Sequence, residues 1–260
     1  MLRSLYTASS GMIAQQSHLD TIANNLANVN TTGFKKNRIN FQDLLYQQTK
    51  LPTEEKPIHV EIGTGVMVAS TLVDFQQGII QPTGNSLDMA IDGAGFFRIL
   101  MPNGEVGYTR NGAFRMDSQG VIVNSEGYRV LDENNAFLTL PANMREVEIS
   151  ANGGISAIID GQDAPEEVGV LGLTIFRNST GLEKRGGSIY LPTAASGDPQ
   201  NGVANDVGFG EIRNYFLENS NVSVVEEMVN MITAQRAYEI NTKAIQTSDE
   251  ILQMTNNLRR

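Results

Sequence analysis

Apolar side chains recur at helical spacing through the first thirty residues. Four of them stand every seven positions: Leu5, Met12, Leu19 and Leu26. This spacing is typical of the contact stripe of an amphipathic or coiled-coil helix. Asn, Thr and Gly residues at 28–33 favour turns and predict the end of the helix there. Polar Ser9 and Gln16 dilute the stripe, so the helix would be marginal alone in water.

The C-terminal segment repeats the same pattern. Ser223 and Glu226 have the spacing of a capping box, which predicts a helix start. Five apolar residues then recur every seven positions: Val224, Met231, Tyr238, Ile245 and Leu252. At about 1.5 Å per residue the two helices would extend roughly 40 and 50 Å. We expect the two stripes to pack together, which requires the chain to leave along one helix and return along the other.

Short alternating segments fill the middle of the chain. Clusters of Gly with Asn, Asp or Ser recur every eight to twelve residues and separate segments such as 87–92 and 171–175. This pattern predicts short strands in an antiparallel sandwich or barrel. The expected fold class is α+β, with long N- and C-terminal helices forming a discontinuous coiled-coil domain around a central antiparallel β domain. The expected divisions are a helical assembly domain at 1–36 and 221–260, a connector at 37–84 and an outer β domain at 85–220.

The segment 46–65 fits neither pattern. It contains Pro52, Pro57, Gly63 and Gly65, so it is too long and too interrupted for a simple turn. The sequence predicts a long surface loop or an extended hairpin here.

Composition and charge exclude several classes of protein. The chain has 260 residues, no cysteine, two histidines and a formal charge of -10. Disulfides and cysteine-ligated metal sites are therefore impossible. Residues 47–210 hold ten basic and twenty acidic side chains, so the whole negative charge lies in the middle. A net-acidic chain with no basic run longer than KKNR at 35–38 is a poor candidate for binding nucleic acid.

Candidate catalytic residues are few. The glycine-rich segment 93–98 lacks the third glycine of a dinucleotide-binding loop. Asp88 and Asp92 would share one face of a strand about 13 Å apart, beyond the roughly 5 to 9.5 Å of glycosidase carboxylate pairs; we expect both to be solvated. Alternation would place one ring of the adjacent Phe96 and Phe97 in the core and the other outward, where it could contact a neighbour. We favour the alternative, a core position at a sheet corner. The sequence predicts no enzyme, no cofactor and no metal site.

The sequence offers no membrane or secretory signal. No stretch approaches eighteen apolar residues, and the N-terminus lacks the continuous apolar region of a signal peptide. We expect a protein that stays in the cytoplasm or leaves by a route that reads no such signal.

Four separated segments resemble the bacterial flagellar rod and hook family. They are NNLANVNTTGFKK at 24–36, NSLDMAIDGAGFF at 85–97, YTRNGAFRMDSQGVIVNSEGY at 108–128 and ENSNVSVVEEMVNMITAQRAYEINTKAIQTSDEILQ at 218–253. Together they span nearly the whole chain in order. The resemblance implies a structural subunit that assembles into a helical polymer, with terminal helices lining a tube and a β domain outside. The two seven-residue stripes would then form the self-assembly interface.

The resemblance also implies location and partners. Members are exported through the flagellar export apparatus without a cleaved signal peptide and occupy the basal body across the periplasm. The expected partners are further copies of the chain, proximal rod and hook proteins, ring proteins around the rod and the export apparatus. Chain length and the segments 46–65 and 176–206 look most like the distal rod, a rigid hollow shaft that passes torque to the hook. The segment 46–65 would then be an arm between subunits, carried by Tyr46, Leu51, Pro52, Pro57 and Ile62.

Three alternatives remain open at this stage. A proximal rod or hook subunit of the same family would share the terminal helices. A peptidoglycan-active enzyme would need a close pair of carboxylates. A monomeric binding module would not polymerise at any concentration.

Overall fold

The computed structural model describes residues 2–50, 60–141, 143–160 and 165–257. The chain divides into two compact units. The helical unit contains Met1–Ala27, Asn37–Val73 and Ser223–Arg260, and the β unit contains Asn28–Lys36 and Asp74–Val222. The helical unit is therefore built from both ends of the chain and one internal segment.

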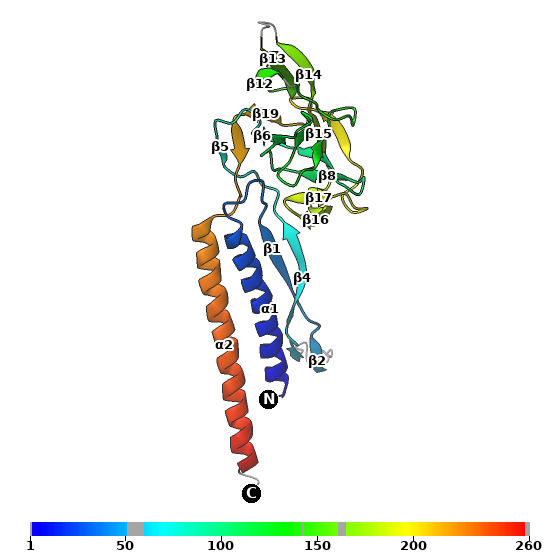
Figure 1. Ribbon diagram of the computed structural model, residues 1–260. Helices are drawn as coiled ribbons and strands as arrows, with labels where there is room; N and C mark the ends of the chain where they lie inside the picture. The colour runs from blue at the N-terminus through cyan, green and yellow to red at the C-terminus, as the bar shows by residue number, and fades with distance from the viewer. Residues whose placement is uncertain (1, 51–59, 142, 161–164, 258–260) are drawn as a thin grey trace. The chain divides into compact units, whose positions relative to one another are not determined.

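Two long helices dominate the helical unit. Helix α1 (Leu2–Ala27) and helix α2 (Val224–Asn257) run antiparallel and side by side (Figure 1). This confirms the predicted pair of packed terminal helices. The backbone N–H of Glu226 donates to Ser223 Oγ at 3.5 Å, and that of Glu227 to the Ser223 carbonyl at 3.0 Å. The two glutamates also place negative charge at the helix N-terminus, where the helix dipole favours it.

Small and polar side chains line the contact between the helices. A Cβ added at Gly11 would lie 3.0 Å from Nδ2 of Asn241, so the helices approach closely there. The Thr242 hydroxyl lies 3.5 Å from the sulfur of Met12. In α2 only Glu227 and Ala234 are buried among the described residues. The helix pair is thus close-packed but hides little apolar surface within one chain.

A long β-ribbon packs against α1. Strands β1 (Asn37–Asp43) and β4 (Val66–Val73) pair antiparallel with a bulge between Asn40 and Phe41. The His18 and Phe41 rings meet edge-on at 5.6 Å, and the Val66 N–H donates to Ser10 Oγ at 3.3 Å. Both contacts hold the ribbon to the helix.

The ribbon continues into a second, shorter hairpin. Strands β2 (Gln47–Lys50) and β3 (Val60–Ile62) pair antiparallel, with Gln47 opposite Ile62. The extended-hairpin interpretation of segment 46–65 is confirmed for these strands. Leu51, Pro52 and Pro57 lie outside the described residues.

The β unit consists of short antiparallel strands. They are β5 (Ile80–Pro82), β6 (Met89–Asp92), β7 (Phe96–Leu100), β8 (Val106–Thr109), β9 (Arg115–Met116), β10 (Ile122–Val123), β11 (Arg129–Val130), β12 (Met144–Ile149), β13 (Gly154–Ile159), β14 (Glu166–Val170), β15 (Gly172–Ile175), β16 (Glu183–Gly186), β17 (Ile189–Leu191), β18 (Gln200–Val203), β19 (Glu211–Asn214) and β20 (Phe216–Glu218). The main sheet has the order β16-β17-β8-β7-β11-β10-β9, and β15 joins it by pairing with β7 and β18. Strands β12, β13 and β14 form a separate sheet. The predicted central antiparallel domain is confirmed.

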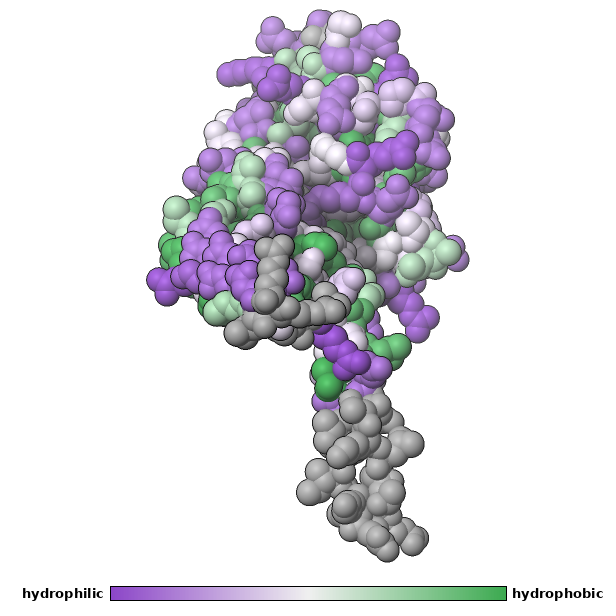
Figure 2. Space-filling view, turned by 90° about the horizontal axis from the view of Figure 1, so that it is seen from below, coloured by the Kyte–Doolittle hydropathy of each residue, from purple (hydrophilic) through white to green (hydrophobic). Residues whose placement is uncertain are grey.

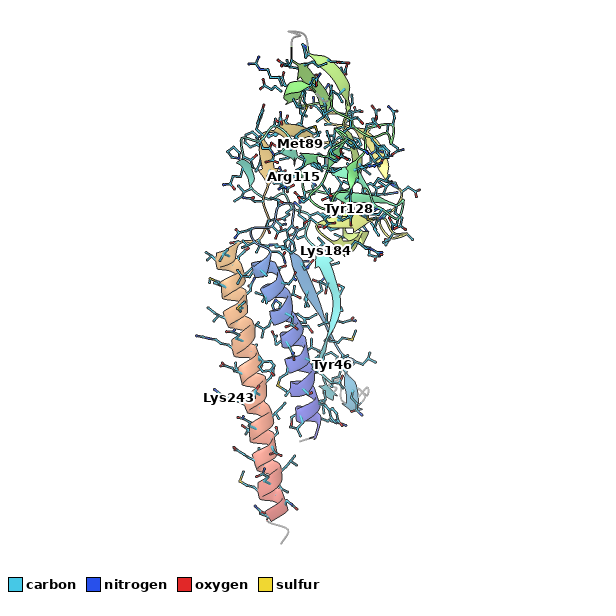
Figure 3. The ribbon with its side chains drawn as sticks, in the orientation of Figure 1. Tyr46, Met89, Arg115, Tyr128, Lys184 and Lys243 are labelled. Carbon is cyan, nitrogen blue, oxygen red and sulfur yellow. The ribbon has the colours of Figure 1, made fainter. Side chains whose placement is uncertain are left out.

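Aliphatic side chains from these strands form one core. Met89, which lies inside the unit in Figure 3, Ile99 and Leu173 belong to it and are almost completely buried. Phe97 joins this core, and Phe96 is buried at 3% exposure. Phe96 contacts the rings of Phe75, Phe176 and Tyr190 instead. The favoured core position is therefore confirmed for both rings, and the outward alternative is wrong because a second aromatic cluster covers Phe96.

Asp88 also departs from expectation. It was expected to be solvated, but it is buried at 7% exposure. Its carboxylate accepts a hydrogen bond of 3.0 Å from Nδ2 of Asn85, which supplies the polar partner that a buried carboxylate requires.

Candidate functional site

Helix α2 carries a second apolar stripe that faces solvent. Its members are between 41% and 74% exposed: Val225, Met228, Val229, Ile232, Ile240, Ile251 and Met254. At about 100° of rotation per residue, these positions fall on one side of the helix. We call them the outer stripe. Exposed apolar residues aligned in this way mark a surface for interaction with protein.

The stripe predicted from the seven-residue repeat lies on roughly the opposite side of α2. Met231, Ile245 and Leu252 are half-buried, whereas Val224 and Tyr238 are 38% and 37% exposed. The α1 stripe is half-buried throughout: Leu5, Met12, Leu19 and Leu26. The heptad reading missed the outer stripe because it followed a single register. The spacing Val225, Val229, Ile232 was the signal that could have found it.

Apolar side chains also reach the surface where α1 begins. Tyr6 and Ile13 on α1 are 74% and 65% exposed, and Leu45 and Tyr46 before the β2–β3 hairpin are 89% and 54% exposed. A pocket of about 230 Å³ lies between this end of α1 and the hairpin, lined in part by Tyr6 and Ile62. Tyr46 lies at the hairpin base, and Lys243 projects from the side of α2 away from α1 (Figure 3). In the view from below, hydrophobic patches are scattered among hydrophilic ones (Figure 2).

A buried polar contact joins three segments of the helical unit. Asn25, near the end of α1, is 2% exposed. Its Nδ2 donates to the Asn37 carbonyl at 2.8 Å and to Glu227 Oε2 at 3.3 Å, and its Oδ1 accepts from the Asn37 N–H at 2.9 Å. One side chain thus ties the end of α1, the start of β1 and the first turn of α2 together.

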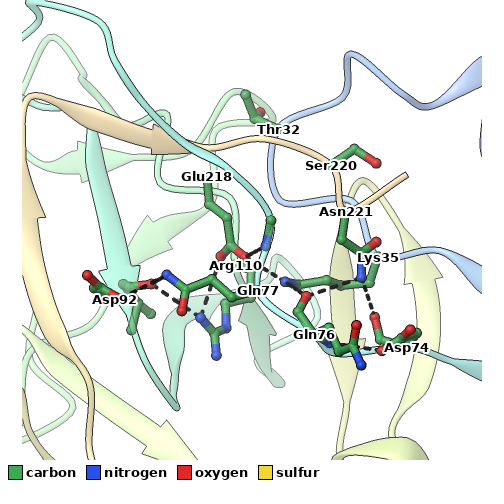
Figure 4. Close-up of polar contacts among 12 residues, drawn as sticks. Thr32, Lys35, Asp74, Gln76, Gln77, Asp92, Arg110, Glu218, Ser220 and Asn221 are labelled. Atoms are coloured by element: carbon green, nitrogen blue, oxygen red, sulfur yellow. Dashed lines mark hydrogen bonds and ion pairs between the residues drawn. The ribbon is translucent and has the colours of Figure 1, made fainter. Parts of the chain in front are cut away.

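The β unit contains a corresponding cluster of buried charges (Figure 4). Lys35 Nζ lies 2.6 Å from Glu218 Oε1, and both side chains are fully buried. Arg110 Nη1 lies 3.5 Å from the other carboxylate oxygen, and the Gly78 N–H donates to Oε1 at 2.8 Å. We call Lys35, Arg110 and Glu218 the ion cluster.

Burial and pairing act in opposite directions on the two cations. Burial lowers the pKa of Lys35 and of Arg110, while the Glu218 carboxylate raises both pKa values and offsets part of that effect. The buried charges in such a cluster stabilise one another, since removing one partner from a buried pair typically costs about 3 to 5 kcal/mol.

The ion cluster joins the chain segments that lead to the helical unit. The Gly33 N–H donates to the Glu218 carbonyl at 2.8 Å. Gly33 has φ of +67°, and a Cβ there would meet the backbone of Asn111, so only glycine allows this approach. Asn221 accepts from the Lys36 N–H at 2.8 Å and donates to the Asp74 carbonyl at 2.9 Å. The segments following α1, following β4 and preceding α2 are therefore fastened to one another.

The described part of the chain offers no cluster of metal-binding side chains. No group of three or more His, Asp or Glu side chains there could hold a metal ion. Asp92 is engaged by Arg213 at 2.6 Å and by Gln77 at 3.1 Å. Neither described helix has a stretch long and apolar enough to cross a membrane.

Comparisons with known proteins all point to one cellular structure. Residues 5–35 match the family described as "Flagella basal body rod protein", residues 90–157 match "Flagellar hook protein FlgE/F/G D1 domain" and residues 213–258 match "Flagellar basal body rod FlgEFG protein C-terminal". The flagellar basal-body rod proteins FlgG of Borreliella burgdorferi and Bacillus subtilis are 46% and 40% identical, each over 100% of both chains. The flagellar hook-basal body complex protein FlhP of Bacillus subtilis is 34% identical, also over 100% of both chains.

Proposed function

Because the chain belongs to the FlgG family of flagellar basal-body rod proteins, we propose that it is the structural subunit of the distal rod. Copies of the chain assemble into a hollow, rigid shaft that passes torque to the hook. A rod protein is a structural component, so no catalytic step belongs to this proposal.

The outer stripe of α2 is the observation that carries the assembly mechanism. The helix has two apolar faces, and α1 of the same chain packs against only one of them. The exposed face offers a surface for a neighbouring copy. Contacts between unlike surfaces of identical subunits repeat without closing and generate a helical polymer. The α1 and α2 stripes line the resulting assembly, with further contacts at Tyr46 and Ile62 of the hairpin.

Torque transmission needs firm connections inside each unit. Asn25 fixes the ends of three segments in the helical unit, and the ion cluster with Asn221 fixes the corresponding segments in the β unit. Buried polar groups with few alternative arrangements resist rearrangement under load.

The remaining partners follow from a position in the rod. The proximal rod precedes the subunit, the hook follows it and ring proteins surround it as it crosses the periplasm. The chain reaches this place through the flagellar export apparatus. A pull-down with each neighbouring component tests each contact separately.

A matched pair of α2 variants tests the assembly surface. Ile232→Glu places a carboxylate within the outer stripe, and Asn230→Glu adds the same carboxylate at an exposed position outside it. Ile232→Glu should abolish filaments in electron micrographs, because docking would bury an unpaired charge. Asn230→Glu should assemble. Both monomers should melt like the wild type, since residue 232 is already 52% exposed.

Two results would overturn the proposal. Normal filaments from Ile232→Glu would remove the outer stripe from the interface. A wild-type chain that remains monomeric at high concentration would favour a binding module, and release of fragments from purified cell walls would favour an enzyme.

A further inference from the structure

The β unit contains a pocket that the rod assignment does not explain. It has a volume of about 350 Å³, and the aromatic residues Phe75, Phe96 and Phe176 belong to its lining. Arg110, Gln77 and residues 93–95 line it as well. The Gly210 N–H donates to the Ala94 carbonyl at 2.7 Å, which fixes this edge of the pocket. Arg110 and Gln77 are shown in Figure 4.

Arg110 is incompletely satisfied although it is only 6% exposed. Its Nη2 donates to the Gly93 carbonyl at 2.8 Å, but the contacts of Nη1 with the Ile91 carbonyl and Glu218 are long, at 3.4 and 3.5 Å. Its Nε has no hydrogen-bond partner in the described part of the chain. A buried guanidinium normally uses its donors fully. Arg110 therefore has donor capacity beside the pocket.

The charges around Arg110 leave a local positive excess. Lys35 takes the short contact with Glu218, so one carboxylate faces two cations in the ion cluster. Asp92, which precedes the pocket residue Gly93, is already held by Arg213 at 2.6 Å. An added anion would compensate the excess without displacing an existing partner.

The aromatic part of the pocket lining suits a short aliphatic segment of a ligand. The ring centroids of Phe75 and Phe96 lie 5.5 Å apart, and those of Phe96 and Phe176 lie 5.9 Å apart, all edge-on. Arg110 Cζ lies 5.4 Å from the Phe96 centroid, so the guanidinium borders this apolar surface. A ligand with a methylene group against the rings and a charged oxygen against Arg110 would contact both the apolar and the charged parts of the lining.

We propose that this pocket receives the carboxylate of an aspartate or glutamate side chain from a second copy of the chain. This rests on the proposed polymerisation and adds a specific contact to it. The occupant follows from charge: twenty acidic against ten basic residues lie in positions 47–210, so copies meeting through this region present carboxylates to each other. Bidentate carboxylate binding is the recognition for which an arginine fork is best suited.

Variants of Ala94 test the contact without touching the ion cluster. Ala94 is exposed at the pocket edge, so substitutions there should leave the fold intact. Ala94→Glu should raise the critical concentration for polymerisation at least about tenfold over Ala94→Gln, because it repels the incoming carboxylate and competes for Arg110. Ala94→Lys should polymerise at least as well as Ala94→Gln. Equal critical concentrations for the three variants, or a higher value for Lys than for Glu, would overturn the proposal.

A small-molecule probe tests binding to this pocket independently of polymerisation. We expect 4-fluorophenylacetate to bind the full-length monomer in ¹⁹F NMR, and its neutral amide to bind at least about tenfold more weakly. Ala94→Glu should weaken acid binding relative to Ala94→Gln. Arg110→Gln should abolish it in protein that remains folded by circular dichroism. Equal binding of acid and amide would sink the proposal, whereas specific acid binding by a wild-type chain that never polymerises would count against the proposed function alone.

Discussion

At the scale of single residues, the contacts that fasten the chain together carry no local sequence signal. Lys35 belongs to a short basic run that resembles a solvated surface, yet it is completely buried against a carboxylate 183 positions away. Asn25 likewise reads as a polar residue near a helix end, but it contacts both β1 and α2. Sequence periodicity identifies which side of an element is apolar. It does not identify which polar side chains will be enclosed when distant segments meet.

Tyr190 supplies a test of burial at this scale. Its ring is fully buried, its hydroxyl has no partner in the described residues, and burial raises its pKa well above the ordinary value. Because the pKa of Tyr190 is raised in the folded protein, the neutral side chain contributes fully to the free energy of unfolding below pH 10. This contribution is lost as the pH rises above 10, because the unfolded chain then releases the phenol proton while the folded protein keeps it. Replacing Tyr190 with Phe should be neutral or stabilising at pH 7. It should also remove the part of the wild-type loss that this ionisation causes, about 1 kcal/mol between pH 10 and 11.

Urea unfolding of the β unit, measured at pH 7, 10 and 11, checks this expectation. The two proteins should diverge only in the alkaline range. A parallel loss of stability in wild type and variant would show that the folded protein ionises Tyr190 as readily as the unfolded chain.

At the scale of elements, regular spacing predicted the helices well and the strands in outline. The turn residues after position 27 and the capping sequence at Ser223 mark the observed ends of α1 and α2. Alternation marked the strands but not their partners, because neighbours such as β7 and β15 are joined only by tertiary pairing. Alternation alone would also have turned one ring of the Phe96–Phe97 pair outward, but both faces of this strand are covered.

The weak apolar contact between the helices predicts their behaviour in dilute monomer. The two helices contain 26 and 34 residues. Ordering each residue costs about 1 to 2 kcal/mol, and few apolar side chains of α1 and α2 are buried in return: Ala8, Ala14, Ile22 and Ala234. Amide hydrogens of both helices should therefore exchange rapidly, while those of β7 and β8 exchange slowly.

Filaments provide the comparison for this exchange experiment. Both helices should become protected on polymerisation, because neighbours then cover the exposed stripes. Slow exchange throughout α1 and α2 in dilute monomer would show that one chain alone stabilises the pair.

At the scale of the whole molecule, the family follows from motifs spread along the full length, whereas we propose that the stiffness of the shaft depends on one segment. The hairpin formed by β2 and β3 extends from the end of the ribbon. It is not part of the two helices whose apolar stripes we propose to drive assembly. A flexible hook must let subunits slide, and a shaft must prevent it. An arm that bridges copies would supply that constraint.

Deleting residues 47–62 tests the arm. Gln47 and Ile62 are paired, and a Cβ at Gly63 would lie 3.4 Å from the Tyr46 ring, so the deletion joins residues that are already adjacent. Filaments should still form, since the helices remain, but their persistence length in electron micrographs should fall. Replacing the same segment with a Gly/Ser linker of equal length is the control for chain length, and it should bend equally. Deletion filaments as straight as the wild type would show that this segment does not act as an arm between copies.

Because the helical unit is built from both ends of the chain, its two helices are synthesised at different times. A chain that emerges N-terminus first presents α1 long before its partner α2 exists, so the two cannot pair until the last residues appear. Bringing ends together across a long loop costs entropy that grows with the logarithm of loop length. In the folded β unit the Lys36 N–H donates to Asn221 at 2.8 Å. A β unit that folds first therefore already holds together the two chain segments that lead to α1 and α2. The outer stripe, which lies on α2, is thus synthesised after both the α1 stripe and the β unit.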